Sequence, residues 1–146
     1  MFKFLRRIII LVIIVAIAVP VVSKFLNTGN KDELAESLAG TQYSWIEEES
    51  NVITGYSCDV THTMIFLDSK TVRVIADGQH VWKKGSNAYP EGKTNVIDYD
   101  YETDFFIEKK LNKILFKYTN MENELVELEM TVEDGKIVKI GKYSKD

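Results

Sequence analysis

The sequence predicts an all-β domain in which seven or eight strands form an antiparallel meander and close into a small barrel, preceded by one transmembrane helix and one short capping helix. Apolar and polar residues alternate through most of the chain after Gly40, which is the period of half-buried strands. Short turn sequences separate these segments, and no helical pattern after Gly40 is long enough to cross between parallel strands. A barrel removes the edges of such a meander, and a two-sheet sandwich is the alternative.

The chain starts with an apolar run from Ile8 to Val22 directly behind a basic segment. A helix of this length spans roughly 22 Å, against about 30 Å of hydrocarbon, so flanking residues must contribute to the span. The run predicts an uncleaved signal-anchor, with the N-terminus cytoplasmic and the domain outside the cell membrane. Cleavage at Ala16–Ala18, which would give a secreted domain, and a buried soluble helix are the alternatives. The chain then divides into an anchor, a short tether and a β domain: residues 1–23, 24–31 and 32–146.

The charge of the exported part excludes nucleic acid as a partner. Three of the 18 basic residues, Lys3, Arg6 and Arg7, precede the apolar run, which leaves 15 basic against 22 acidic residues and a net charge of −7. Nucleic-acid phosphates require a basic surface instead. We therefore expect contact with the membrane through Ile8 to Val22, and contact of the domain with an unknown protein or a small apolar ligand.

One short helix is predicted between the tether and the first strand. Asn30 or Asp32 can cap its N-terminus, and Gly40 supplies a stop signal after Leu38. Leu34 and Leu38 lie four residues apart on one face of this helix. That face is expected to close onto the β domain.

The strands follow from the period-two alternation and from the turn signals between them. They are predicted at Thr41–Glu47, Val60–Leu67, Thr71–Ala76, Gln79–Lys84, Asn95–Ile107 (one long strand or two short ones), Leu111–Thr119, Glu124–Glu133 and Lys136–Tyr143. Asp77-Gly78 and Asp134-Gly135 are predicted as tight hairpin turns, because both central residues of a type I′ turn need positive φ. Residues 68–70 form a further hairpin loop, and Gly85–Lys93 is a longer loop.

The segment Leu38-Ala39-Gly40-Thr41, followed by Trp45 in the first strand, resembles the opening of lipocalin-like small β-barrels. Trp45 lies five residues after Gly40, a wider spacing than is typical of lipocalins. The resemblance implies an interior able to hold a small apolar ligand. It also implies that a basic residue near the end of the chain packs on the tryptophan, and the candidates are Lys136, Lys139 and Lys142.

Four acidic residues, Asp98, Asp100, Glu102 and Asp104, recur at every second position. An extended strand places all four on one face. Carboxylates can bind Ca²⁺, but the run lacks the glycine and the distant glutamate of an EF-hand loop. The stripe is therefore expected on the solvated outer face of a strand.

The metal-ligating and nucleophilic residue types are few. His62 and His80 form a zinc pair only if Asp59 or Asp77 joins them, and no clear third ligand is apparent from the spacing. Cys58 and His62 share a strand face as a catalytic dyad requires, but no residue marks an orienting group or an oxyanion hole. The sequence therefore predicts no catalytic, cofactor-binding or metal-binding residue, and Cys58 is expected to be a small buried hydrophobe.

These observations predict a membrane-anchored extracytoplasmic binding or interaction module and no enzyme. A carrier of a small hydrophobic ligand and an uncharacterised extracytoplasmic enzyme are the alternatives. The candidate binding residues are the amphipathic aromatics Trp45, Trp82 and Tyr89. Large inward residues favour a filled barrel, so the Gly85–Lys93 loop is the expected partner surface.

Overall fold

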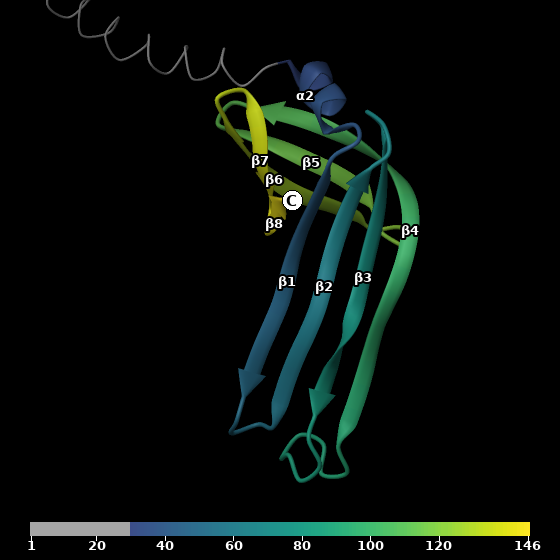
Figure 1. Cartoon of the computed structure of the whole chain (residues 1–146), viewed down its shortest axis with the longest axis vertical. Helices are drawn as coiled ribbons and strands as arrows, with labels where there is room; N and C mark the ends of the chain where they lie inside the picture. Colours follow the sequence, from purple (N-terminus) through teal and green to yellow (C-terminus); the bar gives the residue numbers. More distant parts are fainter. Residues whose placement is uncertain (1–29) are drawn as a thin grey trace, which may run out of the picture.

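The computed structural model describes residues 30–146, so the predicted anchor at Ile8–Val22 and most of the tether lie outside the described residues. Between residues 30 and 146, no helix is long and apolar enough to cross a membrane. The elements in chain order (Figure 1) are α2 (Lys31–Leu38), β1 (Gln42–Asn51), β2 (Tyr56–Phe66), β3 (Thr71–Trp82), β4 (Lys93–Lys110), β5 (Lys113–Thr119), β6 (Leu125–Glu133), β7 (Lys136–Ile140) and β8 (Tyr143–Lys145).

The eight strands form a closed barrel in which each strand pairs antiparallel with the next one along the chain. Closure occurs between β8 and β1, where Tyr43 faces Lys145 and Ser44 faces Ser144. The predicted all-β antiparallel barrel is therefore confirmed, and the sandwich alternative is wrong.

Strands β1 to β4 are longer than the barrel and continue past it as a sheet with two open edges (Figure 1). The registers explain this shape, because β1 pairs with β8 only at Tyr43 and Ser44. Strand β4 pairs with β3 over Lys93–Asp104 and with β5 only over Phe105–Lys110. We call the extension the open sheet, and its residues are 46–51, 56–61, 77–82 and 93–98.

The predicted hairpin turn at Asp77-Gly78 is wrong, because β3 runs through both residues without interruption. Gly78 lies opposite Val60 with φ +151°, and a Cβ atom built on it would lie 2.0 Å from the carbonyl oxygen of Asp59. Glycine is required here because the two backbones approach too closely for any side chain. The two short strands expected on either side of the turn are consequently one strand of twelve residues.

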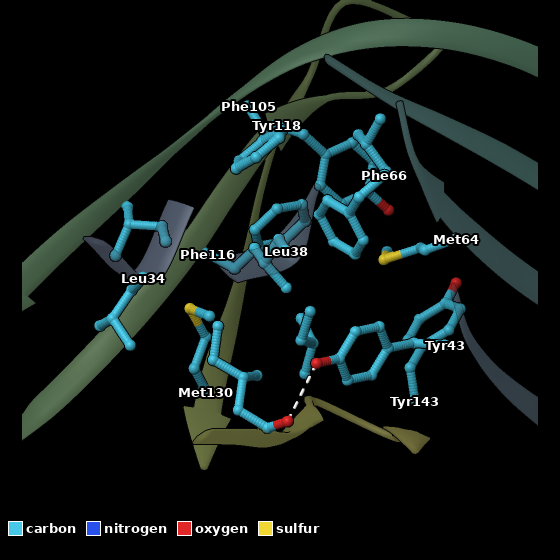
Figure 2. Packing of buried hydrophobic residues seen from close by; sticks show 14 of the residues in the cluster. Leu34, Leu38, Tyr43, Met64, Phe66, Phe105, Phe116, Tyr118, Met130 and Tyr143 are labelled. Carbon is cyan, nitrogen blue, oxygen red and sulfur yellow. Dashed lines mark hydrogen bonds between the residues drawn. The ribbon is translucent and has the colours of Figure 1, made fainter. Parts of the chain in front are cut away.

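Helix α2 covers one end of the barrel, as its apolar face predicts (Figure 1). At its start, the backbone N–H of Asn30 donates to Glu33 Oε2 at 3.1 Å. At its end, Gly40 adopts φ +72° and its N–H donates to the carbonyl oxygen of Phe66, which fastens the helix to β2. Leu34 and Leu38 are 2% and 0% exposed and belong to the main core cluster (Figure 2).

Large aromatic side chains fill the barrel beneath this helix. The ring of Phe66 meets the rings of Tyr43, Phe105 and Phe116 edge-on, with centroids 5.2 to 5.8 Å apart. The hydroxyl of Tyr43 donates to the carbonyl oxygen of Ile137 at 2.9 Å, the bond drawn in Figure 2. This end of the barrel is therefore packed by the protein's own side chains.

The remaining turns agree largely with the sequence. Asp134 and Gly135 both have positive φ, which confirms the tight turn predicted there. The last predicted strand is instead divided into β7 and β8 by a turn at Gly141, where φ is +58°. Asn95–Ile107 belongs to a single long strand, β4.

The acidic stripe lies on the outer face of β4, as predicted. Asp98, Asp100, Glu102 and Asp104 are all exposed. Asp100 accepts two hydrogen bonds from the Arg73 guanidinium of β3, at 2.7 and 2.5 Å. This pair lowers the pKa of the Asp100 carboxyl.

Replacing Gly78 by alanine should destabilise the domain by roughly 2–4 kcal/mol, because the new Cβ meets the β2 backbone and the φ angle is unfavourable. Urea unfolding of the full chain should show a lower midpoint with an unchanged slope. Gly85→Ala is the control, since Gly85 also has positive φ but a Cβ built on it meets no atom within 4 Å. Its cost should be about 1 kcal/mol. Equal costs for the two substitutions would contradict the close approach at Gly78.

Candidate functional site

A pocket of about 360 Å³ lies where the barrel meets the open sheet. Trp45 lies two residues further along β1 than Tyr43 of the core, so the pocket begins where the packed interior ends. The pocket is lined by residues of six strands and of the turn before β8: Trp45, His62, Tyr99, Tyr118, Leu128, Gly141, Lys142 and Tyr143. We call it the mouth pocket.

Trp45 is the centre of the aromatic lining. Its ring stacks on His62 with centroids 4.4 Å apart and planes only 4° from parallel. Tyr143 approaches the same indole edge-on at 6.3 Å. The ammonium of Lys142 lies 4.6 Å from the Trp45 ring centroid, within cation–π range. Of the three lysines that the sequence offered for this contact, the structure places Lys142 on the tryptophan.

The polar groups of the mouth pocket are mainly tyrosine hydroxyls. Burial raises the pKa of Tyr143 to about 12, and it raises the pKa of Tyr118 further. Burial also raises the pKa of Tyr99. These hydroxyls therefore stay protonated at neutral pH and can donate hydrogen bonds to a ligand. An apolar lining with a few donors is the usual composition of a small-molecule site.

A second group of side chains lies on the same face of the open sheet. Glu47, Cys58 and His80 come from β1, β2 and β3, and their ligand atoms all lie within 4.8 Å of one another. The sulfur of Cys58 is 3.7 Å from His80 Nε2, and the hydroxyl of Tyr56 is 2.9 Å from His80 Nδ1. Cys58 is only 3% exposed, as predicted for a buried residue. We call Glu47, Cys58 and His80 the thiol cluster.

Burial raises the pKa of the Cys58 thiol, and the neighbouring carboxylates of Glu47, Glu49 and Asp59 raise it further, although the Tyr56 hydroxyl partly offsets this. A nucleophilic cysteine needs the opposite environment, with cationic neighbours and an exposed sulfur. The surroundings of Cys58 are therefore the opposite of those that activate a cysteine nucleophile.

The structure pairs the histidines differently from the arrangements that the sequence suggested. His62 lies opposite Ala76 and its Nε2–H donates to Glu47 Oε2 at 3.2 Å, whereas His80 lies opposite Cys58. His80 therefore lies level with Cys58, four residues along β2 from His62, which corresponds to roughly 13 Å. The proposed aspartate ligands of a zinc pair are both exposed on the other face: Asp59 and Asp77. The sequence did not reveal the Cys58–His80 contact, because it depends on the register between β2 and β3.

The other two candidate binding residues lie at the far tip of the open sheet, away from Trp45. The rings of Trp82 and Tyr89 are 5.0 Å apart, and Lys93 Nζ lies 4.8 Å from the Tyr89 centroid. Tyr89 is 37% exposed. The hydroxyl of Ser86 donates to the Tyr89 carbonyl and accepts from the Tyr89 N–H, which gives the loop a defined shape.

No protein-family model matches the chain, and comparisons with curated proteins and with solved structures found no match. The fold defines the protein as an eight-stranded antiparallel β-barrel with one short helix in its described part. This arrangement is consistent with a lipocalin-like layout, and the Lys142–Trp45 contact agrees with it.

Replacing Lys142 by glutamine should remove the cation over Trp45 and cost about 0.5–1 kcal/mol. In a Trp82→Phe background, the change should also alter the fluorescence emission of Trp45, the only indole that remains. Lys139→Gln is the matched control, because Lys139 is an exposed lysine on β7. If both substitutions changed the emission equally, the assignment of Lys142 would be wrong.

Proposed function

We propose that the protein is a membrane-anchored extracytoplasmic binding module that takes up a small, largely apolar molecule in the mouth pocket. The observation that carries the proposal is the pocket itself, whose lining is mainly aromatic, with Leu128 and with three tyrosines that are protonated at neutral pH. The apolar run at Ile8–Val22 and the net charge of −7 after Arg7 support the location. Within residues 30–146 the barrel is packed at the α2 end, and the mouth pocket lies at the other end.

The walls suggest the chemistry of the ligand. The indole of Trp45 and the side chain of Leu128 favour a flat apolar body, while Tyr99, Tyr118 and Tyr143 offer donors to an acceptor on that body. A volume of about 360 Å³ lies near the lower end of the range for ligand pockets, about 300–1,000 Å³. The preferred ligand is therefore a compact cyclic or aromatic molecule with one hydrogen-bond acceptor.

A second candidate function is contact with a partner protein at the tip of the open sheet. Val52 and Ile53 in the β1–β2 turn are 96% and 89% exposed. The backbone N–H of Lys83 donates to the carbonyl oxygen of the neighbouring Gly55 at 2.9 Å, so this turn lies beside the start of the loop that carries Tyr89. Exposed aliphatic and aromatic side chains gathered at one tip are typical of an interaction surface.

Photolabelling of the full chain in membranes with an aromatic diazirine probe tests the mouth pocket. Mass spectrometry should locate the label on peptides that contain Trp45 or Tyr143. Leu128→Trp fills the pocket and should reduce this labelling about tenfold, which corresponds to a loss of about 1.4 kcal/mol in binding. Leu125→Trp is the matched control, because Leu125 lies on the same strand but is exposed on the outer face.

Unchanged labelling of the pocket peptides in the Leu128→Trp protein would contradict the proposal. An Ile53→Ser protein separates the two candidate functions, because it alters only the tip of the open sheet. Its pocket labelling should equal that of the wild type. Label that concentrates on the Val52–Ile53 peptide instead of the pocket would favour the partner surface.

A further inference from the structure

We infer that Glu47, Cys58 and His80 form a binding site for a divalent transition-metal ion of the zinc class, with three protein ligands and one open position. The inference does not rest on ligand uptake in the mouth pocket. It also departs from the expectation, based on sequence spacing alone, that the chain binds no metal. The argument rests on the spacing of the ligand atoms, on the group that orients His80 and on the types of ligand present.

Two of the three ligand atoms already have the separation that a small ion needs. Zinc binds thiolate at about 2.3 Å and imidazole at about 2.0–2.1 Å, so a tetrahedral angle places sulfur and nitrogen roughly 3.6 Å apart. The observed distance between Cys58 Sγ and His80 Nε2 is 3.7 Å. A carboxylate oxygen of Glu47 lies within 4.8 Å of both atoms. An ion can therefore enter with only small side-chain rotations.

The orientation of His80 is fixed in the way that metal-binding histidines require. The Tyr56 hydroxyl lies 2.9 Å from His80 Nδ1, so Nδ1–H can donate to the phenol oxygen. In that tautomer the lone pair of Nε2 is directed at Cys58 Sγ, which is the side where the ion would bind. Metal-ligating histidines usually donate their second ring N–H to a neighbouring oxygen in this manner. Tyr56 is thus a positioning residue.

The ligand types favour one class of ion. One thiolate, one imidazole and one carboxylate suit zinc and similar borderline ions, whereas Ca²⁺ and Mg²⁺ need several oxygen ligands. When the ion binds, the Cys58 thiol loses its proton to solvent and the sulfur–metal bond forms. The cation then neutralises the negative charge that the thiolate and Glu47 would otherwise place together.

An exposed carboxylate lies beside the proposed site. Glu49 lies directly opposite Cys58 in the β1–β2 register and is exposed. Either a water molecule or this carboxylate can complete the tetrahedron. Glu47 also contacts His62 of the mouth pocket through Oε2, so its Oε1 is the oxygen that remains for the ion.

Cobalt titration of the full chain, purified in detergent with its thiol reduced, tests the site. Cys58 is the only cysteine in the sequence, so a near-ultraviolet thiolate-to-cobalt absorption band reports this site alone. One equivalent of Co²⁺ should produce that band together with the visible bands of a tetrahedral ion, and Zn²⁺ should displace it. Cys58→Ser should abolish the near-ultraviolet band, and His80→Gln should weaken cobalt binding at least about tenfold.

Two further variants separate metal binding from effects on folding. Tyr56→Phe keeps the ring but removes the oxygen that orients His80, and it should weaken cobalt binding about tenfold. Thr61→Ala, on the same strand as Cys58 but exposed on the opposite face, should leave the titration unchanged. The inference is overturned if folded wild-type protein gives no thiolate-to-cobalt band. It is also overturned if His80→Gln and Tyr56→Phe, with wild-type circular dichroism, bind cobalt as tightly as the wild type does.

Discussion

The close approach of β2 and β3 at Gly78 is the constraint on which the rest of the structure depends. Gly78 has no Cβ, so its backbone can approach Asp59 and Val60 of β2 closely. The close approach allows β3 to continue instead of turning back. The continuous strand places His80 opposite Cys58 and Ala76 opposite His62. It also allows β4 to pair along the whole of β3, which creates the open sheet. The thiol cluster follows directly from this register, and the open sheet that borders the mouth pocket follows from the continuous β3.

The two halves of the domain differ in strand pairing and in packing. Beneath α2, the barrel closes its hydrogen-bond ladder and fills its interior with Tyr43, Phe66 and Phe116, which provides most of the apolar burial. Beyond Trp45 the ladder is open, and the two edge strands carry many charges. Glu48 and Glu49 lie exposed on β1, and Asp98 lies exposed on β4. Like charges at exposed edges oppose pairing with a second chain, which explains how an open sheet avoids edge-to-edge association.

Alternation and turn chemistry predicted the features that depend on local sequence. They identified the short helix, the barrel, the outward acidic stripe and the turn at Asp134-Gly135, because each is determined by neighbouring residues. The prediction of a turn at Asp77-Gly78 was wrong because the same dipeptide suits both a tight turn and a close backbone contact. Only the tertiary structure distinguishes these two cases. The candidate sites also divide into residues that local sequence identifies and contacts that depend on the tertiary structure. Trp45 was found from its aromatic character, whereas the partner of Cys58 lies 22 positions away and is determined by register.

The most direct test of this account is the pairing of β2 with β3, measured by nuclear Overhauser effects in the isotopically labelled full chain. Continuous β3 predicts cross-strand contacts between the backbone protons of Cys58 and His80, and between those of Val60 and Gly78. A hairpin turn at Asp77-Gly78 would instead bring Ala76 next to Gln79 and would leave Cys58 without a contact to His80. Observation of the first pattern would support the register on which the thiol cluster and the open sheet rest, and observation of the second would contradict it.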